Sequence, residues 1–227
     1  MQDVDARKRS AGIAAVDRFV RDGMCVGLGT GSTAYWAIRR VGELVSAGAS
    51  ISAVATSAGT AALCAGLQIP LRALLDAPIA VAIDGADEVA PDFALTKGGG
   101  GALFREKAVA LAAARFVVVV DDRKLVERLG AFPTPVEVVP FAAAWVRQEV
   151  DRLAPGVHVR VRGGEQPFRT DNGNIVLDCA FGAISDPQAL DRSLKAIHGV
   201  VSTGIFCGIA SAVIVGGERG AYELERR

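Results

Sequence analysis

Hydrophobic residues recur in short blocks along the first half of the chain, and segments with helical periodicity separate these blocks. The apolar blocks are rich in β-branched residues and predict buried strands at 24–29, 51–56, 79–84 and 116–122. The periodic segments predict helices at 3–20, 32–48, 58–66 and 102–114. Strands that alternate with helices form parallel sheets covered on both faces, and ligands bind beyond the carboxyl ends of such strands.

The pattern changes at AFPTPVEVVP (131–140), which contains three prolines. The segments from here on predict the order β-α-β-β-α-β, at 136–139, 141–153, 157–162, 174–180, 186–197 and 199–206. TDNGN (170–174) predicts a turn between two of these strands, and AVIVGG (212–217) predicts a last strand that rejoins the first sheet. The sequence thus predicts a Rossmann-like parallel-sheet domain, 1–130 plus 207–227, and a smaller ferredoxin-like α+β domain, 131–206.

Composition narrows the class of protein. The 227 residues are 51% hydrophobic and carry a formal net charge of zero, so nucleic acid and anionic membranes are not expected as partners. The apolar runs are too short to cross a bilayer, and the first residues lack a signal peptide's apolar block, so a cytoplasmic protein is expected. The four cysteines are widely spaced and only two histidines occur, which argues against a disulfide framework or a zinc site.

The glycine-rich stretch GLGTGST (27–33) follows the first predicted strand and opens a predicted helix. Its glycines let the backbone approach a ligand closely, and Thr30, Ser32 and Thr33 add hydroxyl groups. The stretch is similar to a phosphate cradle but lacks the Gly-Lys-Ser/Thr ending of a P-loop. A plain tight turn is the alternative reading.

The stretch DGADEV (84–89) places Asp84 and Asp87 three residues apart at the end of another predicted strand. A tight turn through the intervening glycine can point both carboxylates into one cleft, where one binds sugar hydroxyls and the other moves a proton. An Asx-type turn that caps a helix is the alternative. A metal site is disfavoured by the lack of nearby histidines and by the surrounding lysines.

The stretch KGGGGALFREK (97–107) combines Lys97, four glycines and Glu106. A carboxylate can take a proton from carbon beside a carbonyl, and a lysine ammonium can stabilise the oxyanion that forms. Lys124, in DDRKLV at the end of the next predicted strand, is a further candidate. The alternative for the glycine run is a flexible surface loop, and the alternative for Lys124 is an ordinary surface lysine. Together these groups suit proton transfer on a small phosphorylated polyol.

These motifs, with FPTPVEVVP, TDNGN and GVVSTGIF, occur in the same order as in the ribose-5-phosphate isomerase A family, which the chain resembles over nearly its whole length. The resemblance implies an aldose–ketose isomerase, an intramolecular oxidoreductase of the pentose phosphate pathway. Such an enzyme interconverts ribose 5-phosphate and ribulose 5-phosphate through a cis-enediolate and needs no metal or organic cofactor. The family also forms dimers or tetramers, so a homodimer or homotetramer is expected.

The resemblance also implies roles for particular residues. Glu106 would move the proton between C1 and C2, Lys97 would stabilise the oxyanion, and Asp84 and Asp87 would hold the sugar hydroxyls, with Asp84 assisting ring opening. The expected substrate-binding positions are Lys8, Thr30, Gly31, Ser32, Thr33, Asp84, Gly85, Ala86, Asp87, Lys97, Gly98, Gly99, Gly100 and Lys124.

Three places depart from the family's pattern, and one of them, CGIASAVIVG (207–216), is interpreted as structural. TSAGT (56–60) stands where more serine and an acidic residue are expected, which leaves its side-chain contacts open, and Arg123 stands where serine often precedes the lysine. Two rival functions also remain at this point. A sugar-phosphate sensor would need a DNA-binding domain for which the chain has no spare length, and an acyl-CoA transferase-like enzyme would use a glutamate as nucleophile.

Overall fold

The computed structural model describes residues 2–226, with side chains from Val4 onward. The chain forms two compact units. The first unit comprises Met1–Ala86, Arg105–Leu125 and Ile209–Arg227, and the second comprises Asp87–Phe104 and Val126–Gly208. The boundaries between the units differ from the predicted domain limits because Asp87–Phe104, which carries the glycine run, belongs to the second unit.

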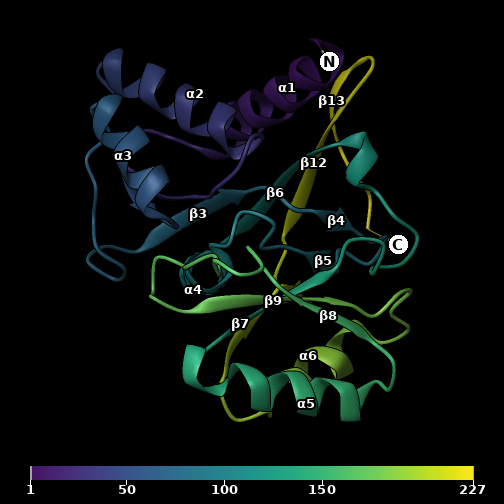
Figure 1. The fold of residues 1–227 in the computed structure, drawn as a ribbon. Coiled ribbons are helices and arrows are strands. Elements are labelled where there is room, and N and C mark those ends of the chain that lie inside the picture. Colours follow the sequence, from purple (N-terminus) through teal and green to yellow (C-terminus); the bar gives the residue numbers. More distant parts are fainter. Residues whose placement is uncertain (1, 227) are drawn as a thin grey trace. The chain divides into compact units, whose positions relative to one another are not determined.

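A six-stranded sheet is the centre of the first unit (Figure 1). Its strand order is β13-β12-β6-β3-β1-β2, and its pairs are parallel except at the antiparallel edge β12–β13. The strands are β1 (Cys25–Leu28), β2 (Ser52–Ala55), β3 (Ile79–Asp84), β6 (Phe116–Asp121), β12 (Ala212–Gly217) and β13 (Gly220–Glu223). The helices are α1 (Gln2–Phe19), α2 (Ala34–Ser46), α3 (Ala58–Gly66), the short η1 (Asp122–Lys124) and most of α4 (Leu103–Ala112).

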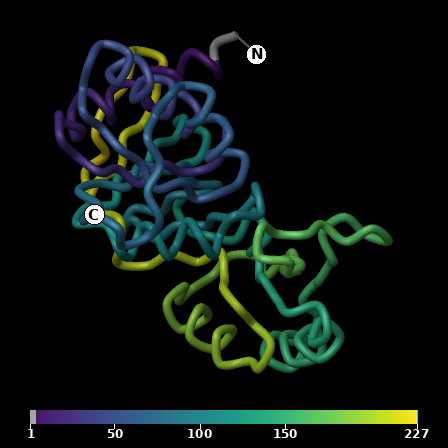
Figure 2. The backbone as a smooth tube through the Cα atoms, turned by 90° about the vertical axis from the view of Figure 1, so that its left-hand side faces the viewer, coloured from purple at the N-terminus to yellow at the C-terminus, as the bar shows by residue number. Residues whose placement is uncertain are grey.

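Alternating side chains give this sheet two apolar faces. Val26 and Leu28 join a buried cluster with residues of α1, α2 and α3. Gly27 faces the other way, where a Cβ atom would come within 2.5 Å of Val109 in α4. Glycine at this position therefore lets α4 pack closely on β1. The first helix of the chain, α1, contacts the last two strands, β12 and β13 (Figure 2).

The second unit contains two antiparallel sheets. The larger has the order β10-β7-β9-β8 and packs against two helices, as a ferredoxin-like α+β fold requires. The smaller has the order β11-β5-β4. The elements are β4 (Glu88–Val89), β5 (Leu95–Thr96), β7 (Thr134–Val138), η2 (Pro140–Ala142), α5 (Ala143–Leu153), β8 (His158–Val161), β9 (Ile175–Ala180), α6 (Pro187–Lys195), β10 (Val200–Thr203) and β11 (Ile205–Phe206).

The predicted fold class is confirmed, and so are the predicted helices and strands, within a few residues, except the strand at 199–206. Three short strands were not predicted, namely β4, β5 and β13. The predicted strand at 199–206 is two strands in two different sheets, because Gly204 separates β10 from β11. A Cβ atom on Gly204 would lie 2.2 Å from the carbonyl oxygen of Lys97, so only glycine fits at this break. Within residues 2–226, no helix is long and apolar enough to cross a membrane.

Candidate active site

The loop between β1 and α2 carries the first predicted cluster of hydroxyl groups. The Thr30 hydroxyl lies 2.9 Å from the Thr56 hydroxyl, 2.8 Å from that of Ser57 and 3.1 Å from that of Thr60. The last three residues belong to TSAGT, the stretch whose side-chain contacts the sequence left open. The cluster is built by the sheet: β1 and β2 are parallel neighbours, so the loops that follow them emerge side by side.

The start of α3 is fixed by the same hydroxyl groups. Ser57 is its N-cap residue and accepts a hydrogen bond from the backbone N–H of Thr60 at 3.0 Å. The Thr60 hydroxyl in turn donates to the carbonyl of Gly29 at 2.8 Å. Ser57 and Thr60 are buried, so this network holds the glycine loop against the first turn of α3.

Asp84 lies at the carboxyl end of β3 and is 3% exposed. Its Oδ1 accepts hydrogen bonds from the backbone N–H groups of Thr30 at 3.0 Å and Gly85 at 2.7 Å. A Cβ atom on Gly29 would lie 1.9 Å from the same oxygen. The glycine in the first loop is therefore required by the carboxylate beside it, and Asp84 of the DGAD motif forms one cluster with the GLGTGST loop.

The remaining predicted positions of this cluster follow from the same loops. Lys8, on α1, donates from Nζ to the Ser32 hydroxyl at 2.9 Å, which brings an ammonium group to the glycine loop. Gly31 is exposed with φ +121°, a backbone conformation that favours glycine. Thr33 is buried at the start of α2, and Gly85 and Ala86 are half-buried after Asp84.

Glu106 and Lys124 belong to the first unit as well. Glu106 lies in the first turn of α4 and is 3% exposed, so this carboxylate is set into the protein at the positive end of a helix. Lys124 ends η1 directly after β6 and is half-buried. The structure thus places Glu106 in the first turn of the predicted helix and Lys124 directly after the predicted strand, as the sequence predicted.

Arg123, the second departure from the family's pattern, forms an ion pair. Its Nε donates to Asp121 Oδ1 at 2.7 Å, while its side chain stays 56% exposed. Burial of Asp121 opposes ionisation, but the hydrogen bond and charge of Arg123, with the charge of Lys8, hold the pKa of this carboxyl below its usual value. The Arg123 guanidinium is thus paired with the carboxylate at the end of β6.

In the second unit, Asp87 and the glycine loop form another cluster. Asp87 Oδ2 accepts a hydrogen bond from the backbone N–H of Gly99 at 2.7 Å, and a Cβ atom on Gly99 would lie 2.6 Å from Oδ1. The neighbouring Gly98 has φ +102°. The glycine run is accordingly an ordered loop held against a carboxylate, and Gly99 and Gly100 are exposed at its tip.

Lys97 is 2% exposed at the start of this loop. Its backbone N–H donates to the carbonyl of Gly204 at 2.7 Å, and its Nζ lies 5.5 Å from the centre of the Phe206 ring. An ammonium buried over an aromatic face is positioned, and its charge is poorly screened by water. Such a group can stabilise a developing negative charge strongly.

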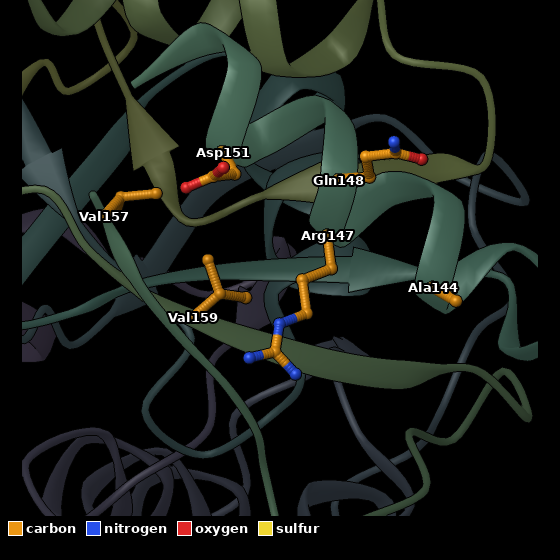
Figure 3. A pocket seen from close by; sticks show the side chains of 6 residues that line it. All are labelled: Ala144, Arg147, Gln148, Asp151, Val157 and Val159. Carbon is orange, nitrogen blue, oxygen red and sulfur yellow. The ribbon is translucent and has the colours of Figure 1, made fainter. Parts of the chain in front are cut away.

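A metal centre does not arise from the described side chains, because no group of three or more His, Cys, Asp or Glu residues there could hold an ion. A surface pocket of about 360 Å³ lies on the second unit between α5 and the start of β8 (Figure 3). Its lining contains none of the predicted site residues; it consists of Ala144, Arg147, Gln148, Asp151, Val157 and Val159.

Comparisons with known proteins identify the family of the chain. Residues 52–220 match the family model described as ribose 5-phosphate isomerase A (phosphoriboisomerase A). A ribose-5-phosphate isomerase A of Thermomicrobium roseum is 50% identical over 224 residues, which cover 97% of this chain and 94% of that protein. One of Methanothermobacter thermautotrophicus is 47% identical, with 94% and 95% covered.

Solved structures show the same relationship. The ribose 5-phosphate isomerase A of Methanocaldococcus jannaschii superposes with a TM-score of 0.91 at 38% identity, covering 96% of this chain and 98% of that one. A D-ribose-5-phosphate isomerase solved in complex with phospho-erythronic acid gives a TM-score of 0.92 at 40% identity, covering 98% and 99%. The chain therefore belongs to the ribose-5-phosphate isomerase A family.

Proposed function

We propose that this protein interconverts D-ribose 5-phosphate and D-ribulose 5-phosphate. Family membership over nearly the whole chain supports the reaction, and the related isomerase that binds phospho-erythronic acid supports a phosphorylated sugar acid or sugar as the kind of ligand. The observation that carries the chemistry is a buried carboxylate, Glu106, one helical turn after a loop that begins with the buried ammonium of Lys97.

The proposed reaction passes through a cis-enediolate. After the furanose ring opens, the carboxylate of Glu106 takes the proton from C2 of the aldehyde, and the electron pair of the C–H bond forms the C1–C2 double bond. The carbonyl electrons move to O1, where the ammonium of Lys97 stabilises the oxyanion. Glu106 then delivers the proton to C1, while the proton of the O2 hydroxyl passes to O1 and leaves a ketone at C2.

Asp84 and Asp87 are proposed to bind the sugar hydroxyls, with Asp84 assisting ring opening. Each carboxylate is fixed by backbone N–H groups, which supports a positioning role: Asp84 by those of Thr30 and Gly85, and Asp87 by that of Gly99. A carboxylate held in this way accepts hydrogen bonds from hydroxyls without first paying the entropy of ordering its own side chain.

The phosphate is proposed to bind at the glycine loop of the first unit. The ammonium of Lys8, 2.9 Å from the Ser32 hydroxyl, and the exposed backbone of Gly31 support this assignment. Lys124 is proposed as a second cation for the same phosphate. Gly98 to Gly100 are proposed to bind the sugar with Lys97.

Ribulose 5-phosphate formation from ribose 5-phosphate, by purified protein treated with EDTA, tests the proposed function. We expect rapid turnover, because none of the proposed steps requires a metal ion. Absence of turnover by folded protein that binds ribose 5-phosphate in calorimetry would contradict the assignment and return the sensor reading.

We also propose a homodimer or homotetramer that works in the cytoplasm. Large apolar side chains exposed on the second unit support self-association: Phe141 is 100% exposed, Trp145 47% and Leu153 42%. Light scattering of the purified protein should give a mass of two or four chains. A monomer at micromolar concentration would contradict the proposal.

A further inference from the structure

The arginine that follows β8 is bonded to the glycine loop of the second unit. Nη1 of Arg162 donates to the carbonyl of Gly98 at 2.8 Å and to that of Gly99 at 3.2 Å. The Gly98 carbonyl also accepts from the N–H of Gly101 at 2.9 Å, which closes a four-residue turn. Arg162 therefore contacts the tip of the loop that begins with Lys97. The sequence around Arg162 predicted no role for this residue.

Asp178 fixes the other side of this guanidinium. Arg162 Nε lies 3.2 Å from Asp178 Oδ2, and Nη2 bonds Oδ1. The arginine side chain is 17% exposed and that of Asp178 8%, so the pair is largely removed from water. A planar guanidinium that gives one edge to a carboxylate can aim its remaining N–H groups in a single direction.

The backbone and an aromatic ring restrain Arg162 further. Its N–H donates to the carbonyl of Val176 at 2.9 Å, and its own carbonyl accepts from the N–H of Phe168 at 2.8 Å. The guanidinium carbon lies 6.0 Å from the centre of the Phe168 ring. This arginine is thus a fixed donor, unlike a mobile surface side chain.

The two carbonyl contacts determine where the neighbouring N–H groups point. In a trans peptide bond the C=O and the N–H point in opposite directions. Holding the carbonyls of Gly98 and Gly99 on the side of Arg162 turns the N–H groups of Gly99 and Gly100 to the opposite side. The Gly99 N–H does reach Asp87 there, at 2.7 Å.

We propose that Arg162, oriented by Asp178, is a positioning residue that holds the Lys97–Gly100 loop in its substrate-binding conformation. The proposal rests on the proposed function, because it assumes that this loop acts on the substrate. Four consecutive glycines have a large conformational freedom that would otherwise have to be lost on each binding event. Arg162 restricts the conformations of the loop before the substrate binds. It thereby holds Asp87 and the ammonium of Lys97 in positions from which both can contact the same substrate molecule.

The test compares Arg162→Met with Arg160→Met. Arg160 lies on β8, two residues before Arg162, and within 3.5 Å of the same Asp178, but its side chain is 69% exposed and has no bond to the loop among the contacts described. We expect kcat on ribose 5-phosphate to fall about tenfold or more in Arg162→Met, as for misplaced catalytic groups, with a smaller change in KM. Arg160→Met should stay close to wild type, and Arg162→Lys should recover part of the loss.

A double variant separates positioning from simple stability. Arg162→Met leaves the buried Asp178 without its main partner, which can destabilise the fold by itself. Adding Asp178→Asn removes that charge but does not restore the hold on the loop. The double variant should therefore regain thermal stability and remain slow; recovery of kcat together with stability would overturn the proposal.

Hydrogen exchange of the segment 95–104 supplies a measurement that is independent of catalysis. Three of its amides are hydrogen-bonded in the loop, those of Lys97, Gly99 and Gly101. We expect faster exchange in Arg162→Met and wild-type exchange in Arg160→Met. Unchanged exchange in Arg162→Met would refute the positioning role, whereas a wild-type protein that shows this ordered loop but no turnover would refute the proposed function instead.

Discussion

The hydroxyl cluster around Thr30 shows what single residues contribute. Thr30 was predicted from its place in a glycine-rich strand-to-helix turn, but its partners Thr56, Ser57 and Thr60 were not. Their contacts depend on β1 and β2 being neighbours with matching ends, as in the pairing of Leu28 with Ala55. Strand order is a property of the whole sheet, and the short segments that predict each strand do not contain it.

Arg162 was missed for a related reason. It is the last residue of the strand predicted at 157–162, among several other arginines, and a lone arginine is most often a solvated surface charge. Its role depends on two contacts that are distant in the sequence. One is with Asp178 on the neighbouring strand β9, and the other is with the glycine loop, more than sixty residues earlier in the chain. Pairing of β8 with β9 was the available signal, since it places positions 160 and 178 opposite each other.

Lys124→Ala should weaken substrate binding more than it slows catalysis. Removing a cation from a phosphate costs a charge-assisted hydrogen bond, which corresponds to a rise in KM of roughly tenfold or more. The measurement is the KM for ribose 5-phosphate, with Lys195→Ala, an exposed lysine of α6, as the control. An unchanged KM in Lys124→Ala would remove Lys124 from the proposed phosphate site.

At the scale of elements, the glycine loop was predicted as a place of close approach, and the structure supplies the partners. Gly99 lies against Asp87, and Gly98 has a positive φ. The short strands β4 and β5, between Asp84 and this loop, were not predicted, because two-residue strands carry no periodic pattern. β5 pairs with both β4 and β11, and this sheet fixes the position of Lys97, which directly follows β5.

The predicted turn TDNGN is anchored on a buried carboxylate. Glu137, in β7, is fully buried, and its Oε1 accepts hydrogen bonds from the side chains of Thr170, Asn172 and Asn174 at 2.9, 3.1 and 2.9 Å. The polar side chains of the motif therefore fix the turn onto the neighbouring strand β7.

Glu137→Ala should destabilise the second unit, because three buried or part-buried donors lose their acceptor. Loss of a buried hydrogen-bond partner costs about 1–3 kcal/mol in the free energy of unfolding. Urea unfolding measures this change, and Glu165→Gln, an exposed glutamate in the loop before the turn, is the control. Equal unfolding midpoints for Glu137→Ala and the wild type would contradict the anchoring role.

At the scale of the whole molecule, the sequence pattern predicted a parallel α/β sheet and a separate ferredoxin-like sheet, and both are present. The domain limits themselves stay a prediction. The chain crosses between the compact units also at Ala86–Asp87 and Phe104–Arg105. These crossings fall inside the DGAD motif and inside α4. Because each of these segments is continuous in the sequence, no local pattern indicates that the chain passes from one unit to the other there.

Each of the two main apolar clusters holds one fully buried thiol whose reactivity reports on the packing. Burial raises the pKa of Cys64 to about 11, and burial, with the charge of Asp178, raises that of Cys179 to about 12. Cys64 belongs to the apolar cluster of the first unit and Cys179 to that of the second. At about pH 8 both thiols stay protonated and inaccessible, so neither should react with a thiol reagent in the native protein.

Mass spectrometry after brief labelling checks this expectation. The half-buried Cys207 is the site where we expect any rapid modification, and guanidinium should expose all four cysteines as the positive control. Rapid labelling of Cys64 or Cys179 without denaturant would show that the corresponding core opens readily, contrary to the packing described above.

The central claim is that the carboxylate of Glu106 carries the proton during isomerisation. The most direct measurement is kcat and KM for ribose 5-phosphate in Glu106→Gln beside the wild type, with Glu127→Gln, an exposed glutamate, as the matched control. Loss of a general base should lower kcat by at least about a hundredfold and leave KM nearly unchanged. A folded Glu106→Gln variant with near-normal kcat would contradict the account.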